Sequence, residues 1–176
     1  MAKSLLLTGV PGIGKTTIIR RVVEALGERA GGFYTEEIKG PGGRHGFKLI
    51  TLAGKEATLA HKDYHDPDQP RVGRYGVDVQ ALERVGVRAL QRAMDEGKLL
   101  IVDEIGAMEL YSQAFQDILA KAVLGPHHVL GTIMSRPNPA ADVFRHIAQV
   151  EIWEVDRRNR NDIPDRVLKW LRTHID

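Results

Sequence analysis

The chain has 176 residues, 43% of them hydrophobic, which suits a single domain over residues 1–176 with one sizeable core. It contains no cysteine, which excludes disulfides and thiolate-bound zinc or iron–sulfur sites and favours a reducing, cytoplasmic setting. The formal net charge of +2 is nearly balanced, so it gives no strong signal for a nucleic-acid partner.

The first predicted element is a strand in SLLLTG, from Ser4 to Gly9. Its apolar run stops well short of a signal peptide, and no later run reaches membrane-spanning length, so we expect no membrane association. After a glycine-rich segment, apolar residues recur at helical spacing from Ile18 to Leu26. This part of the chain therefore has the order strand, loop, helix.

Two strand-like runs, at 31–40 and 45–54, follow the first helix and predict a β-hairpin, because Pro-Gly-Gly between them suits a tight reversal. A loop over 61–73 then leads to a short strand at 74–78. Apolar periodicity in the remainder predicts helices and strands in alternation: a helix at 79–94, a strand at 98–106, a helix at 108–125, a strand at 127–133, a helix at 140–145, a strand at 149–155 and a helix at 164–173. The order indicates an α/β fold, a sheet covered by helices on both faces.

The glycine-rich segment fits the pattern G-x-x-x-x-G-K-[ST] between a strand and a helix. Backbone N–H groups of such a loop converge on phosphate oxygens, which side chains at Gly12 and Gly14 would obstruct. Lys15 adds a charge that reaches the β- and γ-phosphates, and Thr16 offers a hydroxyl to magnesium. The predicted nucleotide-binding residues here are Gly9, Val10, Pro11, Gly12, Ile13, Gly14, Lys15, Thr16 and Thr17.

An acidic pair ends the apolar strand in LLIVDEIGAMEL. Asp103 is placed to hold magnesium together with Thr16, and Glu104 to orient and polarise a water in line with the γ-phosphate. The alternative is that the two carboxylates only open a turn. If Glu104 has this catalytic role, the chemistry is hydrolysis of a triphosphate.

These motifs resemble the small P-loop nucleoside triphosphatases first described from thermophiles, also known as the cancer-related nucleoside triphosphatase family. The resemblance spans nearly the whole chain and rests on TGVPGIGKTT, GGFYTEEIKGPGGRHGFKLITLAG, RVGRYGVD, IVDEIGAMEL, GTI and NRN. It implies a three-layer α/β/α P-loop fold with a mostly parallel sheet of the additional-strand, catalytic-glutamate type and a hairpin after the first helix. It also implies slow, magnesium-dependent hydrolysis of several nucleoside triphosphates with little base preference.

The resemblance places the acidic motif on Leu100, Ile101, Val102, Asp103, Glu104, Ile105, Gly106 and Ala107. It implies that the strand after this motif lies beside the first strand, where Thr132 contacts the γ-phosphate or the water, unless this threonine only suits a strand. Arg71 matches a family arginine and is a candidate catalytic finger, with Arg74 and Arg136 as competitors. Arg136 departs from the family pattern, and for each arginine a solvated surface role is the alternative.

Asn159 and Arg160 follow the last predicted strand, where a doubly wound sheet places a loop near the nucleobase. A guanidinium can stack on any base, which suits low base selectivity. The alternative is that this segment caps the terminal helix through Asn161 or Asp162.

Three further groups remain open on sequence alone. Glu36 and Glu37 face either the site or solvent. The histidines and aspartates of the 61–74 loop lack a frame that fixes metal-ligand geometry, so we interpret them as solvated. The loop itself is a candidate flap over the nucleotide.

The sequence thus predicts Mg²⁺ as cofactor and nucleoside triphosphates as partners, and it leaves the oligomeric state open with a monomer favoured. A small-molecule kinase that uses the same loop, and a nucleotide-gated interaction switch, are the alternatives.

Overall fold

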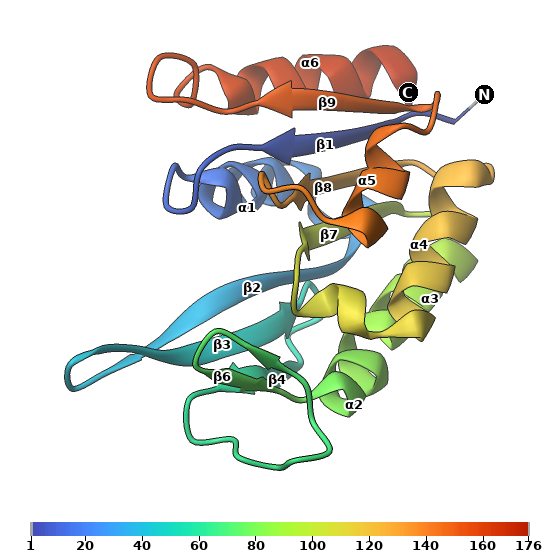
Figure 1. Cartoon of the computed structure of the whole chain (residues 1–176). Coiled ribbons are helices and arrows are strands. Elements are labelled where there is room, and N and C mark those ends of the chain that lie inside the picture. Colours follow the sequence, from blue (N-terminus) through green and yellow to red (C-terminus); the bar gives the residue numbers. More distant parts are fainter. Residues whose placement is uncertain (1, 176) are drawn as a thin grey trace.

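Across residues 2–175, which the computed structural model describes, the strands form one nine-stranded sheet in the order β5-β6-β4-β3-β2-β7-β8-β1-β9 (Figure 1). The strands are β1 (Ser4–Thr8), β2 (Ala30–Gly40), β3 (Gly43–Thr51), β4 (Glu56–His61), β5 (Arg71–Val72), β6 (Tyr75–Val77), β7 (Leu99–Ile105), β8 (Val129–Ile133) and β9 (Val150–Glu154). The α-helices are α1 (Lys15–Leu26), α2 (Val79–Ala81), α3 (Arg88–Asp95), α4 (Gln113–Leu124), α5 (Pro139–Arg145) and α6 (Ile163–His174).

The half of the sheet that runs β2-β7-β8-β1-β9 is parallel. In this half β8 lies between β7 and β1, the order that the resemblance to P-loop triphosphatases implies. Helices cover both faces, and the three-layer α/β/α architecture expected from the sequence is confirmed. Because parallel strands share one carboxyl edge, the loops after β1, β7 and β8 meet at a single edge of the sheet.

The leucine run of β1 shows how the sequence builds two cores. Leu6 packs in one hydrophobic cluster with residues of α3, α4 and α5, whereas Leu5 and Leu7 pack in the other with residues of α1 and α6. Successive side chains of a strand point to opposite faces, so a strand buried on both sides needs a continuous apolar run. All three leucines are completely buried.

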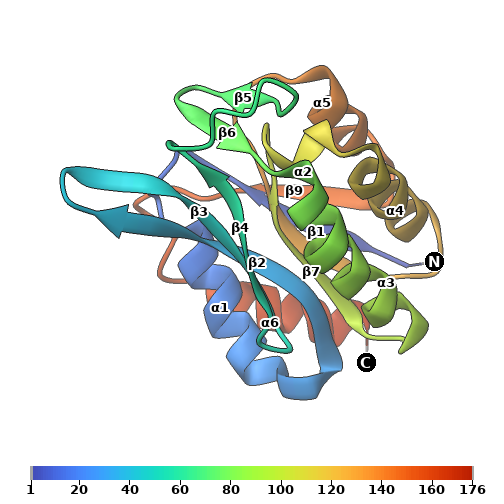
Figure 2. The same ribbon diagram turned by 90° about the horizontal axis from the view of Figure 1, so that it is seen from below.

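The other half of the sheet is antiparallel and begins with the predicted hairpin, in which Tyr34 of β2 faces Ile50 of β3. The hairpin extends well beyond the helical layers (Figures 1 and 2). The strand β4 was not predicted. Its six residues gain their strand conformation by pairing with β3, with Lys48 opposite Thr58. The short strand β5 lies within the segment 61–73 that was predicted as a loop, and it forms by pairing with β6, which matches the strand predicted at 74–78.

Two predicted helices are interrupted. The helix over 79–94 contains a π-helical segment, Leu82–Val87, between α2 and α3. The helix over 108–125 divides into a 3₁₀ turn at Glu109–Tyr111 and the helix α4. Ser112 separates the two, because its extended backbone stops the turn and its side chain accepts a hydrogen bond from the amide of Phe115 at 3.0 Å.

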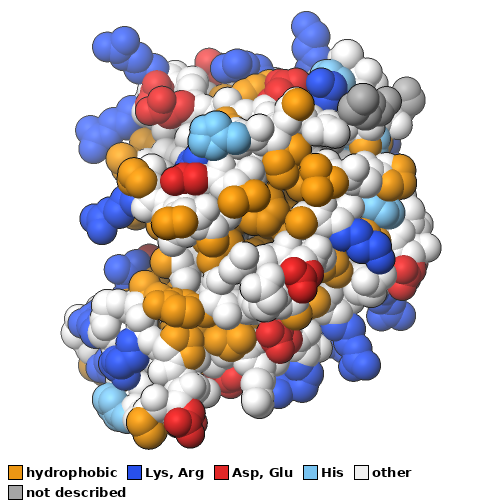
Figure 3. Space-filling view, turned by 45° about the vertical axis from the view of Figure 1, so that its right-hand side comes forward, with side chains coloured by type: hydrophobic (Ala, Val, Ile, Leu, Met, Phe, Trp, Pro, Cys, Tyr) orange, Lys and Arg blue, Asp and Glu red, His pale blue; other side chains and the backbone are white. Residues whose placement is uncertain are grey.

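The helices of the described residues include none that is long and apolar enough to cross a membrane. In the space-filling view, apolar side chains lie across the middle of the face that carries α4, with Lys and Arg around its rim (Figure 3). The large exposed apolar residues of the described chain include Tyr111, Leu124 and Val143.

Candidate active site

The glycine-rich loop joins the carboxyl end of β1 to the first turn of α1, as the motif requires. Gly12 and Gly14 have φ angles of 82° and 113°, which L-residues rarely adopt. A Cβ atom at either position would meet no other protein atom within 4 Å. Within the protein itself, therefore, these two positions need glycine for their backbone angles rather than for space.

Lys15 bends back over this loop. Its ammonium donates a short hydrogen bond to the carbonyl of Gly9 and lies 3.5 Å from that of Val10. These two carbonyls thus hold the ammonium of Lys15 against the backbone of the loop that would surround a phosphate.

Asp103 links three elements at the carboxyl edge of the sheet. Its Oδ2 accepts a hydrogen bond from the hydroxyl of Thr16 on α1 at 2.8 Å, and its Oδ1 accepts one from the hydroxyl of Thr132 on β8 at 2.6 Å. The Asp103 side chain itself stands on β7 and is only 2% exposed. The structure therefore brings together the phosphate loop, the acidic strand and the residue predicted at the end of β8.

Burial raises the pKa of the Asp103 carboxyl, and several neighbours oppose this shift. The hydroxyls of Thr132 and Thr16, the backbone amide of Thr35 and the charge of Lys15 all favour the ionised form. These four groups limit the rise of the Asp103 pKa without reversing it, and a bound cation would favour the ionised form further.

Glu104 is the second carboxylate of the strand end, and a third, Glu109, lies beside it. A Cβ atom built on Gly106 would lie 2.7 Å from Oε1 of Glu104 and 2.9 Å from Oε2 of Glu109, so both carboxylates flank this glycine. Burial and the charge of Asp103 raise the pKa of Glu104. Burial and the charge of Glu104 raise the pKa of Glu109 well above its usual value.

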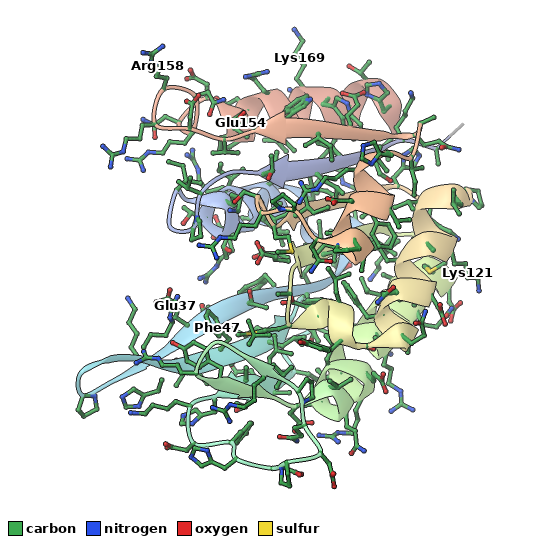
Figure 4. All side chains as sticks on the ribbon, in the orientation of Figure 1. Glu37, Phe47, Lys121, Glu154, Arg158 and Lys169 are labelled. Atoms are coloured by element: carbon green, nitrogen blue, oxygen red, sulfur yellow. The ribbon has the colours of Figure 1, made fainter. Side chains whose placement is uncertain are left out.

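A small cavity of about 170 Å³ adjoins these carboxylates. Its walls include Glu104 and Glu109 together with the apolar side chains of Phe47, Leu59 and Val72. Figure 4 shows Phe47 on the hairpin, facing the segment that follows β7. The carboxylates thus border a space with largely apolar walls.

Sequence reasoning missed two residues of this region. Thr35 lies in the motif GGFYTEEIKGPGGRHGFKLITLAG, and its backbone amide interacts with Asp103 because β2 and β7 are parallel neighbours. Glu109 lies in the quoted motif IVDEIGAMEL, where an acidic residue followed by an apolar one suggested only a helix. Glu109 is only 5% exposed in the folded protein. The sequence alone does not show that this carboxylate is buried.

Of the three candidate arginine fingers, Arg71 lies on the short strand β5, Arg74 in the turn that follows it, and Arg136 in the loop after β8. Arg71 donates to the carbonyls of Tyr64 and Arg74, both at 2.7 Å, and thus holds the 61–74 loop together. Arg74 donates to the carbonyl of Arg44 on the hairpin at 2.7 Å. Arg136 is exposed in the loop after β8, and its carbonyl accepts a hydrogen bond from Arg145 at 3.3 Å. Within the described residues, none of these guanidiniums contacts the phosphate loop.

The segment after β9 approaches the phosphate loop through one residue. Arg160 donates to the carbonyl of Ile13 at 3.4 Å, whereas Asn159 bonds to the backbone of Glu154 and Asp156 within its own loop. Asp162 occupies the N-cap of α6 without a capping hydrogen bond from its side chain. Arg158 of the same loop points away from the body of the molecule (Figure 4).

The remaining sequence candidates contribute no side-chain hydrogen bond to this cluster of polar groups. Glu36 forms ion pairs with Arg20 and Lys48, and Glu37 forms one with Arg44, all on or beside the hairpin. The apolar members of the acidic motif are core residues of β7, and they support the site by carrying Asp103: Leu100, Ile101, Val102 and Ile105. Among residues 2–175 no group of three or more His, Asp or Glu is arranged to hold a metal, the 61–74 loop included.

Comparison with known proteins agrees with this geometry. The profile of the protein family described as NTPase matches residues 4–168. The chain belongs to this NTPase family. A nucleoside-triphosphatase THEP1 of Thermotoga sp. strain RQ2 is 42% identical over 168 residues, which cover 96% of this chain and 95% of the relative. The human cancer-related nucleoside-triphosphatase is 36% identical, over 95% of this chain and 96% of the relative.

Solved structures of the NTPase family share the fold. The crystal structure of THEP1 from Aquifex aeolicus superimposes with a TM-score of 0.88 at 36% identity, over 96% of this chain and 98% of that one. The solution structure of a human cancer-related nucleoside triphosphatase gives a TM-score of 0.85 at 32% identity, over 99% and 100% of the two chains. The resemblance inferred from the motifs is thereby confirmed over nearly the full length.

Proposed function

We propose that this protein hydrolyses nucleoside 5′-triphosphates to nucleoside diphosphate and phosphate, with Mg²⁺ as cofactor and broad base specificity. One observation carries the proposal: Thr16, in the first turn after the phosphate loop, hydrogen-bonds at 2.8 Å to the buried Asp103 of the acidic strand. The residues expected to hold the phosphates and those expected to hold the metal therefore share one site, with Glu104 beside it. The names of the relatives agree with hydrolysis of nucleoside triphosphates.

The donor set suits magnesium. The hydroxyl of Thr16 and the carboxylate of Asp103 are hard oxygen ligands, and Mg²⁺ is commonly bound by one or two protein oxygens plus substrate phosphates and water. When bound there, the ion would supply positive charge against the negative charge that develops on the phosphates. Thr132 holds the other carboxylate oxygen at 2.6 Å and so fixes the orientation of Asp103.

The residues of the chain divide the remaining work. The loop amides and the free N–H groups at the start of α1 bind the phosphates, and Lys15 leaves the carbonyl of Gly9 to reach the β- and γ-phosphates. Glu104 accepts a proton from the attacking water and holds that water in line with the γ-phosphate. We propose Arg71 as an internal arginine finger. When the 61–74 loop closes, the guanidinium exchanges its two hydrogen bonds within that loop for contacts with the phosphates.

Broad base specificity is proposed for the segment after β9. Arg160 reaches the carbonyl of Ile13, which places a planar cation at the edge of the phosphate loop. A guanidinium stacks on the π-face of any base without reading its hydrogen-bonding edge. A cytoplasmic location and a monomeric state complete the proposal.

Glu104→Gln tests the assigned base. The amide keeps the shape of the side chain but cannot accept the proton, so phosphate release should fall about 10²–10⁴-fold while the affinity for a triphosphate changes little. The assay contains only triphosphate and Mg²⁺, and Glu151→Gln on β9 is the matched control. Unchanged turnover in Glu104→Gln rejects Glu104 as the base.

A small-molecule kinase is the second candidate, favoured by the cavity of about 170 Å³ beside Glu104. Its apolar walls suit part of an acceptor alcohol, whose proton Glu104 would take in place of that of water. The same assay separates the two functions. Phosphate release without any acceptor supports the hydrolase, and a strict requirement for an added alcohol supports the kinase.

A further inference from the structure

A second and larger cavity, of about 690 Å³, lies at the edge of the sheet opposite the phosphate loop. It is bordered by the last turn of α1, the first residues of β2, the turn between β3 and β4, and the wall formed by the π-helical segment and α3. Figure 2 shows the start of β2 between the end of α1 and α3. The first residue of α1 that borders this cavity is Val23, eight residues after Lys15 and so about 12 Å from it along the helix axis, and the residues that line the cavity include none of the phosphate loop. The two sites are therefore distinct.

One wall of this cavity, which we call the α1–α3 cavity, carries three arginines four residues apart. Arg84, Arg88 and Arg92 therefore lie on one side of the helical segment, spaced about 6 Å along its axis. Arg92 pairs with Glu96 at 3.2 Å. Within residues 2–175, neither Arg84 nor Arg88 has an ion-pair or hydrogen-bond partner for its side chain, although both border the cavity. Two guanidiniums thus remain available to an anion.

The facing wall has the opposite charge. Glu24 and Glu28 border the cavity from the end of α1, and apolar side chains, among them Leu52 and Val85, also line it. Two lysines border it as well: Lys55, in the turn between β3 and β4, and Lys98, which pairs with Glu96 at 2.9 Å. A purely anionic ligand would gain from the arginines but would be repelled by these carboxylates. The arrangement favours a molecule with an anionic group at one end and hydrogen-bond donors at the other.

The position of the arginine wall depends on two unusual features of the chain. Arg84 lies in the π-helical segment, and π-helical turns within helices are rare and occur frequently at functional sites. Gly86 in the same segment lets the helix approach the sheet, because a Cβ atom there would lie 2.9 Å from Cδ1 of Leu49. The wall is therefore closely packed against the sheet rather than loosely attached.

We propose that the α1–α3 cavity is a second, non-catalytic binding site for a nucleoside phosphate. Arg84 and Arg88 bind its phosphate groups, since planar guanidiniums match phosphate oxygens, and Glu24 and Glu28 accept hydrogen bonds from the hydroxyls of its sugar or the amino group of its base. The cavity falls in the size range of small-molecule sites. The choice of a nucleoside phosphate rests on the proposed function, because the substrates and products of that reaction are nucleoside phosphates.

Calorimetric titration with ADP and Mg²⁺ tests this site on four proteins. They are the wild type, Lys15→Ala, the double variant Arg84→Ala/Arg88→Ala, and the control Arg172→Ala, which removes an exposed arginine of α6 outside the cavity. We expect two sites per chain in the wild type and in Arg172→Ala. The double variant should lose one site, and Lys15→Ala should lose the other.

Two results overturn the proposal. One is a double variant that still shows both sites, and the other is a wild type with a single site that Lys15→Ala abolishes. Pyrophosphate provides a second arm, because it has no donors for Glu24 and Glu28. It should bind to the site left in Lys15→Ala about tenfold or more weakly than ADP, and equal affinity rejects the role given to the acidic wall.

These results are distinguishable from failure of the proposed function. Phosphate release from triphosphate is measured separately, and Arg84 and Arg88 lie outside the site assigned to that reaction. An enzyme that hydrolyses triphosphates but binds one ADP rejects only the second site. A protein that binds two ADP molecules without hydrolysing triphosphates rejects only the proposed function.

Discussion

Three carboxyl groups share the buried end of β7 with one ammonium group. Asp103, Glu104 and Glu109 are all raised in pKa, each with burial as the main cause, and the charge of Lys15 opposes the shift at Asp103 and Glu104. Like charges at close range disfavour simultaneous ionisation, and the most deeply buried group responds most strongly. Without a bound cation, Glu109 is therefore the carboxyl that stays protonated to the highest pH.

Glu109→Gln should make stability less dependent on pH. The unfolded carboxyl has a pKa near 4.5 and the folded one is well above it, so between these values the folded state binds more protons. The stability of the wild type therefore falls as pH rises through this interval, by at most about 1.4 kcal/mol per pH unit. Glutamine is neutral at every pH, so the stability of the variant relative to the wild type should increase as pH rises. Urea unfolding over a pH series without nucleotide measures this difference, and a constant difference contradicts the argument.

At the scale of elements, Ser112 decides where α4 begins. Its hydroxyl accepts from the amide of Phe115 and donates to Glu83 at 2.8 Å, which ties α4 to the π-helical segment. Periodicity alone predicted one helix through this position, because apolar spacing continues across it. A serine in extended conformation is recognised as a cap only when its partners are known.

Ser112→Ala should destabilise the protein by about 1–2 kcal/mol, since it removes the cap and leaves the partly buried carboxylate of Glu83 without this donor. Thermal unfolding measures the loss, which corresponds to about 2–8 °C for a chain of this length. Gln113→Ala, at the next and exposed position, is the control and should have little effect. Equal melting temperatures for Ser112→Ala and the wild type would show that the cap contributes nothing.

At the scale of the molecule, the phosphate site joins elements from both ends of the chain. α1, β7 and β8 contribute side chains, and Arg160 of the segment before α6 contacts the loop itself. A ligand bound there stabilises contacts that the unfolded chain cannot make. Binding should therefore be visible as global stabilisation.

Triphosphate with Mg²⁺ at about 100 times its dissociation constant should stabilise the wild type by about 2.7 kcal/mol, or about 5–10 °C in melting temperature. Lys15→Ala should lose most of this shift, because the ammonium is the full positive charge of the loop. Lys3→Ala, near the start of β1, is the control for loss of a lysine. A full shift in Lys15→Ala excludes the phosphate loop as the binding site.

The sequence by itself determined the phosphate loop, the acidic strand and most helices and strands, because each depends on local spacing of apolar residues or on backbone angles that glycine permits. Only the tertiary structure decided which residues contact one another. Thr16 and Asp103 are 87 positions apart, and their contact follows from the order of β1, β8 and β7 in the sheet. Arg71 matched a motif equally well, yet its guanidinium bonds within its own loop. Local pattern specifies what a residue can do, and only the register of packed elements specifies which groups it meets.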